Sequence, residues 1–106
     1  MKNTLKTFRS EKMEFEEKLN EMYQEIANHI NGMIPIEWEQ VYTIAYINDG
    51  GGEVSFNYTI PGRDDLHYYT AIPEDCNVSE KTFSELSFTL YKLFKRFREL
   101  FIENNQ

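Results

Sequence analysis

Two long stretches with helical spacing of apolar residues enclose a central segment whose residue types favour β-strands. Over residues 15–34, apolar side chains recur every three or four positions and form one continuous stripe. A second stripe runs over residues 83–101, and Ser79 before it is a residue type that caps helix N-termini. Each stripe must be buried against another layer. We therefore expect two helices that cover one face of the segment between them.

The central segment is predicted to form three antiparallel strands. Residues 38–48 are mostly β-branched and aromatic, and residues 49–52 (Asp-Gly-Gly-Gly) favour a chain reversal. Residues 54–60 alternate apolar and polar side chains, and the Pro-Gly pair at 61–62 fits a type II turn. A third strand is predicted over residues 66–72, with one face made by Leu66, Tyr68, Thr70 and Ile72. The predicted fold is α+β, with the order α-β-β-β-α and two helices packed on a small antiparallel sheet.

The length of 106 residues is enough for one hydrophobic core. Residues 1–12 carry a net charge of +3, whereas residues 13–106 carry −10. Since the apolar pattern also becomes cleaner at Met13, we expect an N-terminal extension over 1–12 and the domain over 13–106. The alternative is that this segment adds an extra frayed turn to the first helix.

No arrangement of side chains predicts catalysis or a cofactor. His29, His67 and Cys76 are not spaced as metal ligands, so neither a metal nor another cofactor is expected. The glycines at 50–52 lack the Lys-Ser/Thr of a phosphate-binding loop. A small enzyme that uses acidic residues and His67 in a cleft remains an alternative, without a motif to support it.

Acidic residues are concentrated in the central segment, where nine acids and one base between Glu37 and Glu80 give a net charge of −8. Such a charge disfavours binding to nucleic acid or an anionic membrane and favours a basic protein partner. The partner-binding residues predicted on this basis are Glu37, Glu39, Asp49, Glu53, Asp64, Asp65, Glu74 and Asp75. Six large rings are interleaved with them, and roughly half should be interface anchors while the others fill the core: Trp38, Tyr42, Tyr46, Tyr58, Tyr68 and Tyr69.

Targeting signals are not predicted. The basic N-terminal segment is not followed by the apolar region of a signal peptide, and no stretch approaches the ~20 apolar residues that span a bilayer. A cytoplasmic location is therefore expected.

Three pieces of the sequence resemble the YezG/EsaG family of bacterial antitoxin, or immunity, proteins. They are MIPIEWEQVY at 33–42, DGGGEVSFNY at 49–58 and PGRDDLHYYTAIP at 61–73, and the resemblance extends over residues 13–106. It implies a small cytoplasmic α+β protein that binds and neutralises a cognate nuclease toxin exported by a type VII secretion system. No catalytic residues are implied. A generic acidic interaction module with a non-nuclease partner is the alternative.

The chain departs from the family pattern at both ends. Residues before Met13 do not match the usual start, and the resemblance implies further strands after the second helix, so the chain is expected to be shortened at its C-terminus. Missing strands would leave a sheet edge and part of the helical stripes uncovered, which favours self-association.

Overall fold

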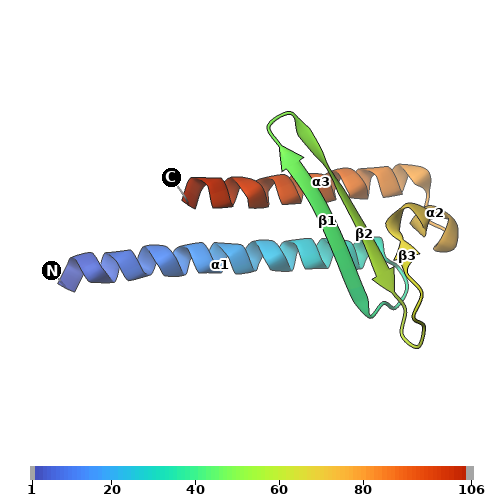
Figure 1. Cartoon of the computed structure of the whole chain (residues 1–106), viewed down its shortest axis with the longest axis horizontal. Coiled ribbons are helices and arrows are strands. Elements are labelled where there is room, and N and C mark those ends of the chain that lie inside the picture. Colours follow the sequence, from blue (N-terminus) through green and yellow to red (C-terminus); the bar gives the residue numbers. More distant parts are fainter. Residues whose placement is uncertain (1, 105–106) are drawn as a thin grey trace.

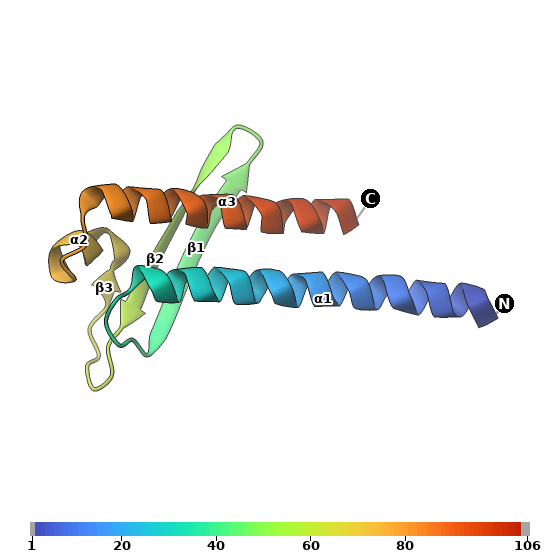
Figure 2. The ribbon, with the colours of Figure 1, turned by 180° about the vertical axis from the view of Figure 1, so that it is seen from behind.

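A computed structural model describes the backbone of residues 2–104 and the side chains of residues 14–104. Two long helices, α1 (Lys2–Met33) and α3 (Glu80–Asn104), lie side by side and antiparallel, and the sheet crosses one face of the pair (Figures 1 and 2). The elements between them are β1 (Gln40–Asn48), β2 (Gly51–Thr59), β3 (His67–Tyr68), η1 (Tyr69–Ala71) and α2 (Ile72–Asp75). The α+β fold and the order of its main helices and strands are confirmed.

The sheet has the order β1-β2-β3 and both pairings are antiparallel. The β1–β2 register runs from Gln40 opposite Thr59 to Asn48 opposite Gly51, so Asp49 and Gly50 form the tip of the hairpin, as the sequence predicts. The alternation predicted for β2 is also confirmed. Every second residue from Val54 to Tyr58 is buried, because that face of the strand lies against the helices.

The core lies between β2 and the two long helices. Its buried side chains on α1 follow the spacing of the predicted stripe, and Leu90 and Leu93 contribute from α3. The α1 members are Ile26, Ile30 and Met33, and Met22 is buried one turn earlier on the same helix. Ile72 of α2 is fully buried and closes the core at the end where α3 begins.

Two local signals in the sequence are confirmed by geometry. The Ser79 side-chain oxygen accepts a hydrogen bond from the Thr82 amide at 3.1 Å, which caps α3 at its N-terminus. Gly62 has φ +81°, and the Arg63 amide donates to the Ile60 carbonyl at 3.1 Å, which is the geometry of a type II turn. The turn fixes where the chain leaves β2, and the cap fixes where α3 begins.

The third strand is much shorter than predicted, since β3 contains only His67 and Tyr68. The chain then forms the single turn η1, followed by α2 with Pro73 in its first turn. In these two helical turns, side chains on one face recur about every three residues instead of every two as in a strand. Tyr69 and Ile72 therefore both point to the core. Tyr69 packs between Phe56 and Phe83, with ring centroids 5.3 and 5.6 Å apart. The prediction of a strand through Ile72 is wrong. A segment as short as 69–72 is compatible both with the alternation of a strand and with the spacing of a helical turn.

Helix α1 continues without a break through the position at which the sequence suggests a domain boundary. The predicted division into residues 1–12 and 13–106 therefore falls inside a helix, and whether residues 1–12 matter to the fold stays a prediction. None of the described helices combines the length and apolarity needed to cross a membrane.

Candidate partner-binding surface

The turn at 60–63 carries charged side chains to the start of β1. A hollow of about 450 Å³ opens there, between the start of β1, the end of β2 and the loop that follows β2. Its lining is acidic, aromatic and polar, and consists of Glu39, Gln40, Tyr42, Thr59, Arg63, Asp64 and Leu66. The structure thus brings together Glu39 and Asp64, two of the predicted partner-binding residues that are 25 positions apart in the sequence.

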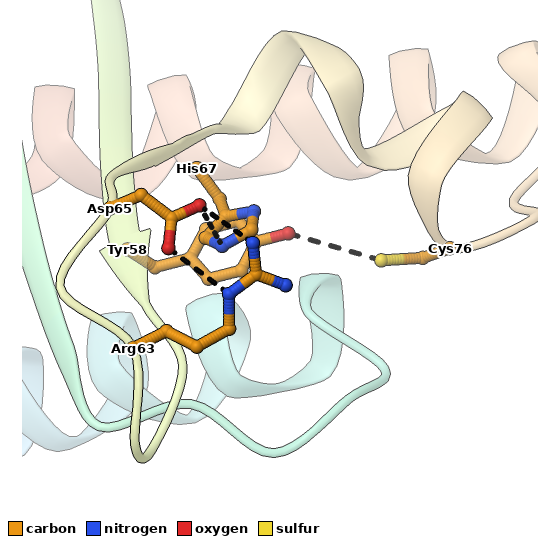
Figure 3. Close-up of polar contacts among 5 residues, drawn as sticks. All are labelled: Tyr58, Arg63, Asp65, His67 and Cys76. Carbon is orange, nitrogen blue, oxygen red and sulfur yellow. Dashed lines mark hydrogen bonds and ion pairs between the residues drawn. The ribbon is translucent and has the colours of Figure 1, made fainter.

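Arg63 is held by the loop itself. Its Nε and Nη2 donate to Oδ1 and Oδ2 of Asp65 at 3.1 and 3.2 Å, and His67 Nε2 lies 3.3 Å from the same carboxylate (Figure 3). Partial desolvation acts to raise the pKa of Asp65. Its own backbone amide, the Arg63 guanidinium and His67 outweigh that effect, and the pKa falls below its ordinary value. Asp65 and Arg63 therefore balance each other's charge.

The His67 ring ties this loop to the core. It stacks on Tyr58, with ring centroids 5.3 Å apart, and the hydroxyl of Tyr58 lies 3.9 Å from Cys76 Sγ (Figure 3). Tyr58 is fully buried, and burial, followed by the contact with Cys76, raises its pKa to about 12. Tyr58 therefore stays neutral at physiological pH and positions the loop through packing.

The side of the sheet that faces away from the helices is aromatic. We call this surface the outer sheet face and define it by Tyr42, Ile44 and Tyr46 of β1, Tyr68 of β3, and Leu66 before β3. Tyr46 is 71% exposed and Tyr68 is 60% exposed. The register places Asn57 of β2 between Tyr42 and Tyr68, so the two rings flank a polar side chain. Exposed tyrosines with polar surroundings are typical of protein interfaces.

Of the six rings that the sequence singles out, three are exposed on this face and three belong to the core or its margin. Tyr58 is buried, while Trp38 and Tyr69 are half-buried against the core. Ile44 and Leu66 were not predicted as surface residues, although both are about half exposed. The signal for Ile44 was available, because it shares its strand parity with Tyr42 and Tyr46.

The eight predicted acids are all exposed, and they occupy separate parts of the molecule. Four lie at the base of the hairpin or in the loop after β2: Glu37, Glu39, Asp64 and Asp65. Asp49 is at the hairpin tip, and Glu53 lies opposite Tyr46 near that tip. The remaining pair, Glu74 and Asp75, is on α2. A nine-residue strand is about 27 Å long, so the acids at the base and at the tip form two ends of one elongated surface.

The charges at these two ends are largely uncompensated. Asp49 has an ion pair with Arg98 of α3 at 3.4 Å, but its side chain remains 97% exposed. Among the side chains of residues 14–104, none forms an ion pair with Glu39, Glu53 or Asp64. The outer sheet face is therefore aromatic, and acidic residues lie beyond both of its ends.

The histidines and the cysteine serve packing and hydrogen bonding. His29 Nε2 lies 2.7 Å from the Leu86 carbonyl oxygen and links α1 to α3. His67 stacks on the Tyr58 ring, and Cys76 Sγ lies next to the Tyr58 hydroxyl. Within residues 14–104, no group of three or more His, Cys, Asp or Glu side chains could hold a metal ion.

The chain matches proteins of one family. The family model described as "Immunity protein YezG-like" matches residues 19–106. The chain is 60% identical over 93 residues to the type VII secretion system protein EsaG of Staphylococcus aureus (strain NCTC 8325 / PS 47), an alignment that covers 88% of this chain and 57% of EsaG. It is 46% identical over 88 residues to the immunity protein YezG of Bacillus spizizenii, with 83% of this chain and 55% of that relative covered.

A third relative is the immunity protein YezG of Bacillus subtilis (strain 168), which is 32% identical over 87 residues, or 82% of this chain and 58% of that protein. The chain therefore belongs to the YezG-like immunity protein family. It spans a little over half the length of these relatives.

Proposed function

We propose that this chain is an immunity protein, an antitoxin that neutralises a cognate toxin by binding it. The family membership carries this proposal, since two of the relatives are immunity proteins and a third is a type VII secretion system protein. Inhibition by binding requires an exposed recognition surface and no catalytic group. The outer sheet face has that character, with exposed tyrosines in the middle and acids beyond both ends.

The partner proposed for this surface is the basic nuclease domain of a toxin exported by a type VII system. A nuclease needs positive charge where it holds its substrate, and Glu39 and Asp64 present uncompensated negative charge around a hollow. The complex would form in the cytoplasm before export. It needs neither metal nor cofactor from this chain, and the acids on α2, Glu74 and Asp75, are the least involved of the predicted set because they lie away from the hollow.

The decisive experiment measures the nuclease activity of a candidate cognate toxin, with increasing amounts of the purified chain. We expect inhibition that is complete near equimolar amounts. The double variant Glu39→Gln/Asp64→Asn should bind about tenfold more weakly, because two charge pairs with the partner are lost. Glu74→Gln/Asp75→Asn is the matched control, with the same change of charge and near-normal binding expected. A nuclease that stays fully active with excess wild-type chain would refute the proposal.

A further inference from the structure

Arg63 lies at the wall of the hollow that the proposed function uses. It is the one base between Glu37 and Glu80, where the chain has nine acids. The same hollow is lined by Glu39 and Asp64, and none of the ion pairs among the side chains of residues 14–104 involves either acid. A cation so close to two carboxylates would be expected to pair with them. The hollow would then lose most of its attraction for a basic partner.

The Arg63 guanidinium is paired with Asp65 instead. Its Nε and Nη2 donate to separate oxygens of that carboxylate at 3.1 and 3.2 Å, and Figure 3 shows the two groups facing each other. A bidentate pair of this kind is among the strong hydrogen-bonded arrangements and fixes the orientation of both groups. Asp65 is not among the residues that line the hollow. The pair therefore directs the base toward an acid outside the hollow.

The loop holds Asp65 in the position that this pairing needs. The backbone of Arg63 is fixed by the preceding turn, in which Gly62 has φ +81°. His67 Nε2 lies 3.3 Å from the Asp65 carboxylate, on the side chain whose ring stacks on the fully buried Tyr58 (Figure 3). The exposed carboxylate is thus connected to the core through His67, so that the orientation of the ion pair is set by the fold.

The other walls of the hollow add no charge. The Tyr42 hydroxyl donates to Gln40 Oε1 at 2.5 Å, and the Gln40 backbone amide donates to Thr59 Oγ1 at 3.2 Å, so these polar groups are already paired with one another. Leu66 is apolar. The charge that a partner meets in the hollow therefore depends on which acid Arg63 is paired with.

We propose that Asp65 is a positioning residue for partner binding, because it keeps the Arg63 guanidinium from pairing with the acids of the hollow. Glu39 and Asp64 then remain free for basic groups of the partner. This inference rests on the proposed function and specifies how the recognition surface keeps its charge. Without the Asp65 carboxylate, Arg63 should pair with the acids beside it, and the chain would occupy its own recognition surface.

A double-mutant cycle with the nuclease domain of a candidate cognate toxin tests this role. Asp65→Asn should weaken binding by about tenfold, since the released Arg63 competes with the partner for the hollow. Arg63→Gln alone should change binding by less than about twofold, because its charge is already balanced in the pair. The double variant should bind within about twofold of the wild type, because no cation is left to enter the hollow. Binding by the double variant also shows that the altered loop folds.

Other roles of Asp65 predict different results in the same cycle. If Asp65 contacts the partner directly, Arg63→Gln cannot restore the binding that Asp65→Asn loses. If only the total charge matters, Arg63→Gln strengthens binding by the same factor with and without Asp65. Glu74→Gln, the matched control on α2, would then weaken binding as much as Asp65→Asn does. Each of these patterns would overturn the inference.

The ion pair is also testable in the free chain, without a partner. Partial desolvation acts to raise the pKa of Asp65, whereas its own backbone amide and Arg63 lower that pKa by more. Arg63→Gln should therefore raise the pKa of the Asp65 carboxyl, as measured by NMR titration of its carboxyl carbon. Lys92→Gln, which removes a base from α3, is the control and should leave it unchanged. An Asp65 pKa that does not respond to Arg63→Gln would overturn the inference.

The outcomes separate this inference from the proposed function. Normal binding and inhibition by Asp65→Asn, or effects of the two substitutions that simply add, would overturn the positioning role and leave the immunity function standing. Failure of the wild-type chain to bind and inhibit would refute both proposals.

Discussion

Tyr58 and Trp38 join the hairpin to its surroundings by a polar atom as well as by packing. The Tyr58 hydroxyl lies against Cys76 Sγ while the ring is fully buried, and Trp38 Nε1 donates to Asn31 Oδ1 at 3.0 Å from a half-buried position. Rings with one polar atom restrict orientation more than apolar rings do. Both residues should therefore matter more to the stability of the free chain than to recognition.

For Trp38, the sequence position between the first helix and the first strand predicts an architectural anchor. Trp38→Ala should lower the free energy of unfolding by about 3 kcal/mol, near the lower end for large rings because Trp38 is only half-buried. Asn31→Ala is the control, which removes the hydrogen-bond acceptor but keeps the ring, and should cost about 1 kcal/mol or less. Chemical denaturation of the free variants measures both. An unchanged midpoint in Trp38→Ala would instead identify Trp38 as a contact residue for the partner.

The raised pKa of Tyr58 predicts a loss of stability in alkaline solution. An unfolded tyrosine loses its proton near the ordinary pKa of 10.0, whereas the folded chain keeps it on Tyr58 to about 12. Between these values the folded state binds more protons than the unfolded state, so the free energy of unfolding falls as the pH rises. Tyr58→Phe should remove this part of the pH dependence. Denaturation of both proteins at about pH 9 and pH 11 measures it, and equal losses in the two would contradict the assignment.

At the scale of elements, two places lead to predictions about stability: Gly52 in the β1–β2 hairpin and the start of helix α1. The hairpin is tight at Gly52, where a Cβ atom would overlap the carbonyl oxygen of Tyr46. Among the described side chains, the end of α3 lies against the turn of α1 around Glu14 and Phe15. These two places give opposite expectations for mutation.

Gly52→Ala should destabilise the chain by about 2 kcal/mol or more, since the overlapping atom belongs to the backbone of the partner strand and cannot move aside. Gly50→Ala is the matched control two positions away, where the new Cβ would meet only Asn48 Oδ1 at an ordinary 3.6 Å. Thermal unfolding of the two variants should rank Gly50→Ala as clearly the more stable. The reverse order would show that the hairpin relaxes around the added methyl group.

Removal of residues 1–12, so that the chain starts at Met13, should lower the melting temperature by less than about 4 °C. The physical reason is that the net charge of this segment, +3, is opposite to that of residues 13–106, and that its apolar residues Leu5 and Phe8 continue the stripe only weakly. A control truncation from the other end, which removes residues 97–106 and with them Phe97 and Phe101, should cost far more. A large loss on removal of residues 1–12 would show that the domain begins before Met13.

At the scale of the whole molecule, charge governs how a partner approaches. The chain carries a net charge of −7, and the acids at the base and tip of the hairpin lie at the two ends of the outer sheet face. A surface of this kind attracts a basic protein over distances comparable with the Debye length, which salt shortens. The effect belongs to the encounter of the two proteins more than to the finished complex.

Association with the cognate toxin should therefore slow as salt rises. We expect the association rate constant to fall by roughly tenfold between about 0.05 and 0.5 M salt, while the dissociation rate changes much less. Stopped-flow or surface-binding kinetics with the toxin nuclease domain would measure both. An association rate that is flat over this range would exclude steering by the acids.

The sequence predicts the architecture well where a signal is long or chemically specific. The helical stripes, the alternation through Val54 and Tyr58, and the cap at Ser79 are of this kind. It fails at 69–72, because four residues fit the period of two of a strand and the period of about three of a helical turn equally well. It also could not bring Glu39 next to Asp64, because that proximity depends on the register of β1 with β2 and on the turn at Gly62. Which tyrosines remain exposed depends on which face of the sheet the helices cover.

The reach of the two helices beyond β1 also has a hydrodynamic consequence. The molecule measures 60 × 35 × 20 Å and has a radius of gyration of 17.4 Å, against about 13 Å for a compact domain of this length. It should therefore tumble anisotropically, and the NMR relaxation of amides should depend on their angle to the helix axes.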